Sequence, residues 1–156
     1  MVSAIENKKL LQHVFSELSH GNSAPFLESL SDEIRWVITG TTKWSRTYEG
    51  KQAVLNELLA PLRTQFAGAY KAIAKRFIAE DDYVAVEFLG QVVTKTGKDY
   101  NNSYCYIFRM GEGKVREITE YLDTELVTAA LADPVQSQEP NDRSSSSYVV
   151  DRPAKK

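Results

Sequence analysis

Glu120 is the residue whose type and surroundings most clearly suggest chemistry in this 156-residue chain. It lies between Ile118 and Leu122, and because side chains alternate along a strand, these three residues share one face. Removal of a carboxylate from water disfavours its charged form and raises its pKa toward values that suit a general base. The alternative is an ion pair across the sheet with Arg109 or Arg116, which would give Glu120 a structural role.

Two further acidic residues are candidates, one for catalysis and one for ligand binding. Asp123 follows the segment that carries Glu120 and is the second candidate for the catalytic base. The pair Asp123-Thr124 precedes an apolar stretch, however, which is also typical of a helix N-cap. Glu87 interrupts the apolar run 84–89 and is a candidate ligand-binding residue. In a half-buried strand, such a residue otherwise points to solvent or pairs across the ladder.

A row of polar-tipped side chains follows one face of a strand predicted over 99–110. Tyr100, Asn102, Tyr104 and Tyr106 share this face because they are two residues apart. We expect Asn102, Tyr104 and Tyr106 to donate hydrogen bonds to a substrate carbonyl or a developing enolate, with Tyr106 as the catalytic residue and the other two as ligand-binding residues. The alternative is a cross-strand aromatic ladder that stiffens the sheet.

The two tryptophans are candidates to cover an apolar ligand. Trp36 falls in the first predicted strand, where it is also typical of an ordinary core residue. Trp44 falls in a loop over 40–50, beside Lys43 and Arg46, which favours a place on the rim of a pocket.

No cofactor or metal is predicted. His13, Glu17 and His20 recur at helical spacing, but they lie opposite the apolar stripe of their helix and lack the further ligands of a closed site. The single Cys105 excludes an internal disulfide and any cysteine-rich metal site. The chain also lacks the glycine-rich loops that hold nucleotides.

The elements that must position these residues fall into two groups, helices first and strands later. Ser3 and Glu6 predict a capping box at the start of a helix that Gly21 ends. Pro25 predicts the start of a short second helix. A strand follows over 34–38, and then a third helix over 54–62, where Pro61 should bend the helix or end a segment.

From residue 70 the pattern changes to strands. Alternating runs over 70–79, 83–94, 99–110 and 114–122, joined by short polar turns, predict an antiparallel meander. A last helical turn or two is expected over 124–131. The predicted class is therefore α+β, with a curved antiparallel sheet wrapped around the N-terminal helices. Helices that cover only part of such a sheet leave a hollow, which is where we expect a ligand.

Charge and composition limit the partners. Lys and Arg number 19, Asp and Glu number 21, and the net charge of -2 argues against nucleic acid and anionic membranes as partners. No apolar run is long enough to span a bilayer or serve as a signal peptide, so a cytoplasmic location is expected. The body of the domain is assigned to 1–132. The segment 133–156, rich in Ser and Pro, is predicted to be a flexible tail whose patch at 148–150 could dock on this domain or on a partner.

Five segments together resemble a known family. They read YNNSYCYIFR at 100–109, GKV at 113–115, EYLDT at 120–124, DEIRW at 32–36 and YEGKQAV at 48–54. Their order and spacing, over nearly all of 1–132, resemble the SnoaL-like, ketosteroid-isomerase-related branch of the nuclear transport factor 2-like superfamily. The resemblance implies a cone-shaped, cystatin-like α+β barrel with a deep pocket, and homodimers that form through the outer sheet face.

The resemblance also implies a range of activities on small molecules. Family members carry out polyketide cyclisation, double-bond isomerisation, dehydration or epoxide hydrolysis. In the cyclases and isomerases, a pocket carboxylate removes a proton next to a carbonyl. The isomerases carry this base near Trp36, Val37 and Ile38, where the present chain has no carboxylate, and their oxyanion-stabilising Asp falls near Tyr106.

Two functions follow as expectations. The first is a cofactor-independent isomerase, cyclase or dehydratase-type lyase that acts on a small apolar, carbonyl-containing molecule. Glu120 or Asp123 would be its base, and Tyr106 would assist. The second is a non-catalytic ligand-binding or dimerisation module of the same fold, which the missing first-strand carboxylate favours.

Overall fold

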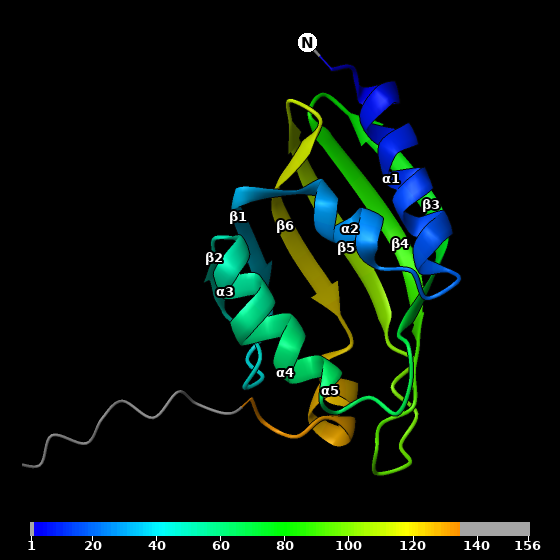
Figure 1. The fold of residues 1–156 in the computed structure, drawn as a ribbon, viewed down its shortest axis with the longest axis vertical. Coiled ribbons are helices and arrows are strands. Elements are labelled where there is room, and N and C mark those ends of the chain that lie inside the picture. Colours follow the sequence, from blue (N-terminus) through cyan, green and yellow to red (C-terminus); the bar gives the residue numbers. More distant parts are fainter. Residues whose placement is uncertain (1, 135–156) are drawn as a thin grey trace, which may run out of the picture.

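A computed structural model describes residues 2–134 of the chain (Figure 1). The helices are α1 (Ala4–Leu18), α2 (Ala24–Ser29), α3 (Lys51–Ala53), α4 (Ala60–Arg63) and α5 (Thr124–Ala130), with a π-helical stretch at Val54–Leu59. The strands are β1 (Leu30–Ile38), β2 (Thr47–Glu49), β3 (Lys71–Glu80), β4 (Tyr83–Gln91), β5 (Ser103–Gly111) and β6 (Lys114–Leu122). The predicted tail lies outside the described residues, apart from Asp133 and Pro134.

The predicted start of α1 is confirmed. The Glu6 backbone N–H donates to Ser3 Oγ at 3.2 Å, and the Ser3 backbone N–H donates to Glu6 Oε2 at 2.8 Å. These reciprocal bonds satisfy two backbone donors that the helix leaves without partners. After the helix, Gly21 takes a positive φ of 81°, a conformation that costs glycine little and that ends the helical run.

The third helical segment, over 51–63, changes its geometry just before Pro61. Because proline has no backbone N–H, it cannot make the regular helical bond to the preceding turn. The turn before it widens to π geometry, in which the Ala60 N–H donates to the Leu55 carbonyl. Pro61 itself lies within α4, which continues to Arg63, so the proline does not end the helix.

The sheet has the order β2-β1-β6-β5-β4-β3 and is mixed. The predicted antiparallel meander from β3 to β6 is confirmed, and so is the α+β class. One pairing corrects the expected all-antiparallel sheet, because β1 runs parallel to β6. The chain leaves β1 through β2 and α3–α4 before it returns as the meander, and a connection of this length permits a parallel pair.

Two of the predicted strands are shorter than their sequence patterns suggest. β4 ends at Gln91 and β5 begins at Ser103, with 92–102 forming a loop between them. In this loop the Asn101 side chain accepts a hydrogen bond from the Val92 N–H at 3.1 Å. The strong alternation continues into the loop, which is why the sequence pattern overestimated both strands.

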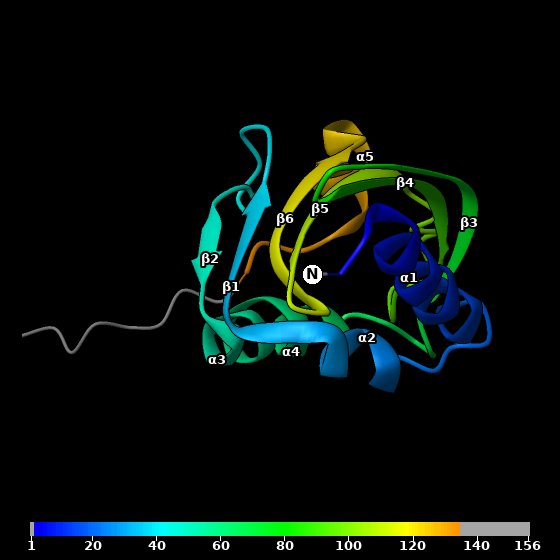
Figure 2. The same cartoon turned by 90° about the horizontal axis from the view of Figure 1, so that it is seen from above.

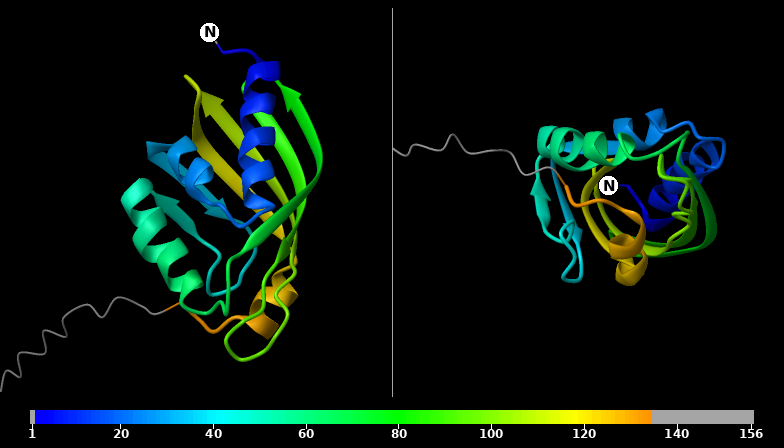
Figure 3. Two further views of the ribbon diagram at one scale, coloured as in Figure 1. Left: turned by 45° about the vertical axis from the view of Figure 1, so that its right-hand side comes forward. Right: turned by 90° about the horizontal axis from the view of Figure 1, so that it is seen from below.

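The sheet curves around the helices, and this curvature creates an inner and an outer face (Figures 2 and 3). Register shifts in β3, between Ala74 and Arg76, and at the β5–β6 pair, between Arg109 and Met110, interrupt the ladders, and such irregularities bend strands. Val84, Phe108 and Ile118 on the inner face are fully buried. Within residues 2–134, no helix is both long and apolar enough to cross a bilayer.

Candidate active site

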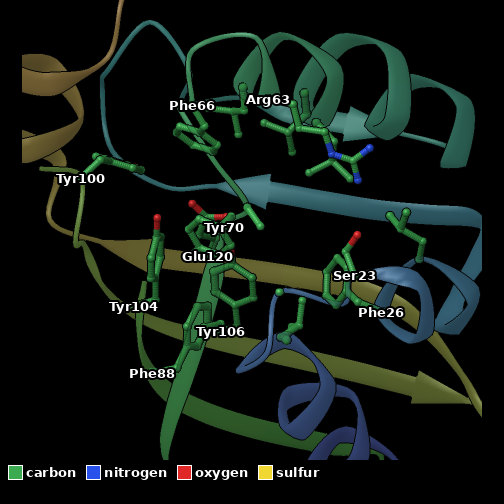
Figure 4. Close-up of a pocket in the computed structure, with 18 of the residues that line it drawn as sticks. Ser23, Phe26, Arg63, Phe66, Tyr70, Phe88, Tyr100, Tyr104, Tyr106 and Glu120 are labelled. Carbon is green, nitrogen blue, oxygen red and sulfur yellow. The ribbon is translucent and has the colours of Figure 1, made fainter. Parts of the chain in front are cut away.

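A cavity of about 410 Å³ lies between the inner face of the sheet and the helices (Figure 4). The strands supply its floor, and the C-terminal end of α1, the start of α2 and the segment from the π-helical stretch to α4 supply its walls. Aromatic and aliphatic side chains make up most of its surface. Among the described residues, the charged side chains that line it are Glu120 and Arg63.

Glu120 lies on the floor of the cavity and is only 5% exposed. Trp36 on β1 donates from Nε1 to Glu120 Oε1 at 3.0 Å. On the other side, β5 places Tyr106 directly opposite Glu120, with its hydroxyl close enough to stabilise the carboxylate. The carboxylate is therefore held between strands that pair with β6 on its two sides.

Burial raises the pKa of Glu120 from 4.5 to about 7, against the opposing hydrogen bonds from Tyr106 and Trp36. The ion-pair alternative does not describe this residue. Arg116 donates to Ser31 Oγ and lies 3.3 Å from a Glu112 carboxylate oxygen, while Arg109 pairs in register with Glu117 on the outer face. A carboxyl group with a pKa near 7 in an apolar cavity can exchange protons with a substrate near neutral pH.

Four tyrosines line the cavity that holds the carboxylate, and one of them is not in the predicted row. Tyr100, Tyr104 and Tyr106 line the cavity as one face of the strand and the loop before it. Tyr70, just before β3, enters from the opposite edge, and its hydroxyl approaches that of Tyr104. Burial raises the pKa of each of these phenols, so they are neutral donors at neutral pH.

The aromatic row also packs as a ladder, the second of the two interpretations offered by the sequence. Tyr104 stacks on Phe88 with ring centroids 4.8 Å apart, and Tyr106 meets Trp36 edge to face at 5.7 Å. The rings stabilise the inner face of the sheet while their hydroxyls point into the cavity (Figure 4). The two roles are thus compatible in the same residues.

Asn102 and Asp123 are joined to each other and do not line the cavity. Asn102 is fully buried, and its amide pairs with the Asp123 backbone, donating to the carbonyl at 3.0 Å and accepting from the N–H at 3.1 Å. The Asp123 side chain caps α5 by accepting from the backbone N–H groups of Glu125 and Leu126 at 3.0 and 3.3 Å. The helix-cap interpretation of Asp123 is confirmed.

Glu87 and Trp44 also lie away from the cavity. Glu87 is on the outer face of β4, where it lies 3.5 Å from the Arg76 guanidinium. Trp44 was expected on an exposed rim, but it is 4% exposed and donates from Nε1 to the Ala132 carbonyl at 3.0 Å. The loop packs inward because its tryptophan ties it to the segment after α5. Of the two tryptophans, Trp36 is the one that lines the cavity.

Sequence reasoning missed Tyr70, Arg63 and Phe66 as cavity residues. Tyr70 lies at the predicted start of a strand and Arg63 at the predicted end of a helix. At such ends the periodic pattern of apolar residues does not predict which way a side chain points. Phe66 stacks at 6.0 Å on Tyr70 and at 6.1 Å on Tyr100, so these aromatic rings form one wall. Only long-range folding brings them together.

Comparisons with known proteins agree on the fold. The sequence profile of the SnoaL-like domain matches residues 11–118. An NTF2-like protein from Burkholderia xenovorans LB400 aligns with a TM-score of 0.64 and 21% identity, over 85% of this chain and 100% of its own. A proposed SnoaL-like polyketide cyclase from Jannaschia sp. CCS1 aligns with a TM-score of 0.67 and 17% identity, over 85% and 95%.

A third structure is an epoxide hydrolase of the LEH-like type from M. tuberculosis. It aligns with a TM-score of 0.62 and 14% identity, over 81% of this chain and 89% of its own. No curated protein matches the sequence. Because the identities are below 25%, the solved structures establish only the fold of this chain. The profile match over 11–118 covers most of the residues that the structure describes.

The raised pKa of Glu120 predicts a specific pH dependence of stability. Because the folded state holds this proton more tightly than the unfolded state, its contribution to the free energy of unfolding is complete below pH 4.5 and is lost as pH rises to about 7. We expect E120Q to match wild type in acid and to exceed it by about 3 kcal/mol above neutral pH. Urea unfolding of both proteins across this range measures the difference.

The control for this experiment is E87Q, which removes a carboxylate from the outer face of the neighbouring strand. It should retain the pH dependence of wild type. A constant difference between E120Q and wild type at every pH would contradict the buried, proton-binding carboxylate.

Gly90 should be required for the position of Tyr70. A Cβ atom at Gly90 would lie 2.6 Å from Tyr70 Oη and 3.1 Å from Tyr104 Cε2. We expect G90A to lower the free energy of unfolding by about 1–3 kcal/mol through overpacking, as measured by urea denaturation. The matched control is G68A, since a Cβ at Gly68 meets nothing within 4 Å. Equal effects of the two substitutions would contradict this packing.

Proposed function

Since the chain belongs to the SnoaL-like domain family, we propose that it is a cofactor-independent isomerase, cyclase or dehydratase-type lyase acting on a small carbonyl compound. One observation carries the proposal: a carboxyl group with a pKa of about 7 lies on the floor of an apolar cavity, beside phenol donors. The catalytic step is the removal of a proton from the carbon next to the carbonyl.

Glu120 is the base in this proposal. Its ionised form takes the proton, and the electron pair of the broken C–H bond moves into the enolate. Trp36 Nε1–H, which bonds Oε1 at 3.0 Å, holds the carboxyl group in position and leaves Oε2 to accept the proton. Tyr106, the cross-strand neighbour of Glu120, is the second group that fixes the carboxylate.

The tyrosine hydroxyls supply a donor for the enolate oxygen. The hydroxyls of Tyr70 and Tyr100 both approach that of Tyr104. Asn102 donates to Tyr100 Oη at 3.3 Å and so takes one of its acceptor sites. Each neutral hydroxyl has one proton to donate, so this group can offer an O–H to a substrate oxygen. A neutral donor fixed in a cavity of low polarity stabilises a developing negative charge.

The enolate then has three routes, which distinguish the possible reactions. Return of the proton from Glu120 to a more distant carbon gives isomerisation. Attack of the enolate carbon on a second carbonyl of the same molecule, whose oxygen takes the proton from Glu120, gives cyclisation. Loss of a hydroxyl group from the next carbon, which leaves as water with the proton from Glu120, gives dehydration. The cavity of about 410 Å³ suits a molecule of small-ligand size.

Deuterium exchange into a bound ketone tests the proposal. We expect wild type to catalyse exchange at the carbon next to the carbonyl, and E120Q to be slower by about 100-fold or more, because it lacks the base. Y106F should retain measurable exchange at a reduced rate. The rate should rise with pH and level off above about 7, as Glu120 ionises. NMR of the recovered ketone measures the incorporation of deuterium.

E87Q is the matched control, because Glu87 lies on the other face of the sheet. Exchange that persists in E120Q at the rate of wild type would refute Glu120 as the base. Tight binding of ketones without exchange would favour the alternative, a ligand-binding module of the same fold.

We propose further that the protein forms a homodimer through the outer face of the sheet. No helix covers this face of β3–β6 among the described residues, and Ile78 and Tyr121 are 57% and 51% exposed on it (Figure 2). Exposed apolar residues gathered on one face are typical of an interface.

A charge placed on this face should give a monomer. We expect wild type to sediment as a dimer, and Y121K to dissociate because the interface would have to bury an unpaired charge. The control is I5K, since Ile5 is 67% exposed on α1. Sedimentation equilibrium measures the oligomeric state of wild type, Y121K and I5K. A Y121K dimer as stable as that of wild type would contradict this interface.

A further inference from the structure

The mouth of the cavity carries a second polar site, formed by Arg63 and Ser23. Both residues line the cavity, Arg63 from the last turn of α4 and Ser23 from the residue before α2. Figure 4 shows the Arg63 guanidinium and the Ser23 hydroxyl directed toward the same space from opposite walls. The hydroxyls of Tyr70 and Tyr104 gather with Glu120 at the other end.

Arg63 has no carboxylate partner within residues 2–134. Four other arginines of this part of the chain each lie within 4 Å of a glutamate: Arg35, Arg46, Arg76 and Arg116. Those pairs lie on the surface, outside the cavity. Arg63 is thus a cation at the entrance of an apolar cavity, with all its donors free for a ligand.

Ser23 is a second, independent sign of a site. It occupies the N-cap position of α2, where a serine normally accepts a hydrogen bond from the backbone, yet its side chain makes no capping bond. The residue is half-buried, and its side chain makes no hydrogen bond with any described residue. Its hydroxyl is therefore available, beside the guanidinium, to an oxygen of the ligand.

We infer that Arg63 and Ser23 bind the carboxylate of the substrate, which is therefore an apolar keto acid. This inference rests on the proposed function for the ketone at the inner end of the cavity. The middle of the cavity, lined by Phe26, Leu59, Leu62 and Phe88, takes the apolar body that joins the two groups.

Charge fixes the direction of binding. The ionised Glu120 at the inner end repels a second carboxylate, while Arg63 at the mouth attracts it. The acid group therefore stays at the mouth and the ketone enters first, toward Glu120 and the tyrosine hydroxyls. Arg63 acts as a substrate-positioning residue that selects acids over neutral ketones of the same shape.

Paired probes test the inference. 6-Acetyl-2-naphthoic acid and its methyl ester share one ketone and one apolar naphthalene that joins the ketone to the acid group, and they differ in the negative charge. Titration of wild type, followed by quenching of tryptophan fluorescence, should give a Kd about tenfold lower for the acid. R63Q should raise the Kd of the acid to near that of the ester, R63K should recover part of the difference, and R63E should weaken the acid further. S23A should weaken the acid by a smaller factor.

The control is R35Q, whose arginine pairs with Glu49 on the surface and which should bind both probes as wild type does. Equal affinity of wild type for acid and ester, or an equal loss for both in R63Q, would overturn the inference. Deuterium exchange into the ester reports separately on Glu120. Acid selectivity without exchange would support the carboxylate site and refute the proposed catalysis. Exchange without acid selectivity would support the catalysis and refute the carboxylate site.

Discussion

The site depends on one constraint, the burial of a single carboxylate under an indole N–H. Glu120 would be costly to hold in an apolar cavity without hydrogen bonds, and the Trp36 bond at 3.0 Å offsets part of this cost. The bond exists because β1 pairs with β6 in parallel, with Trp36 opposite Ile118 and Ile38 opposite Glu120. The parallel pair of the described sheet is therefore the one that supports the candidate base.

The cavity itself exists because several large side chains leave space between sheet and helices. The shape of the floor depends on Gly90, where the absence of a Cβ admits the Tyr70 hydroxyl next to the Tyr104 ring. The π-helical stretch before Pro61 is a second irregularity at the same cavity, because Leu58, Leu59 and Arg63 of this segment line it. Irregular backbone of this kind is frequent at functional sites.

Sequence reasoning reached the parts of the site that follow from local alternation. The two-residue period placed Glu120, Tyr104 and Tyr106 on one face, and β5–β6 pairing sets Tyr106 opposite Glu120. The sequence did not predict Tyr70 or Arg63 as cavity residues, because both lie at the end of a strand or helix, where the periodic pattern of apolar side chains stops. Trp44 shows the same limit: a loop flanked by charged residues still buries its tryptophan when a distant carbonyl, that of Ala132, accepts its N–H.

Asn102 shows how a polar residue among the tyrosines of one strand face can act by holding the backbone. Its position in the row suggested a ligand donor, yet its amide bonds both backbone groups of Asp123, just after β6. The same Asp123 caps α5 with its side chain, so a single buried amide ties together the row of tyrosines, the end of the strand that carries Glu120 and the following helix. A carboxylate can serve as a base only if its strand does not shift, and the Asn102 clamp supplies this rigidity at the end of β6 nearer to Glu120.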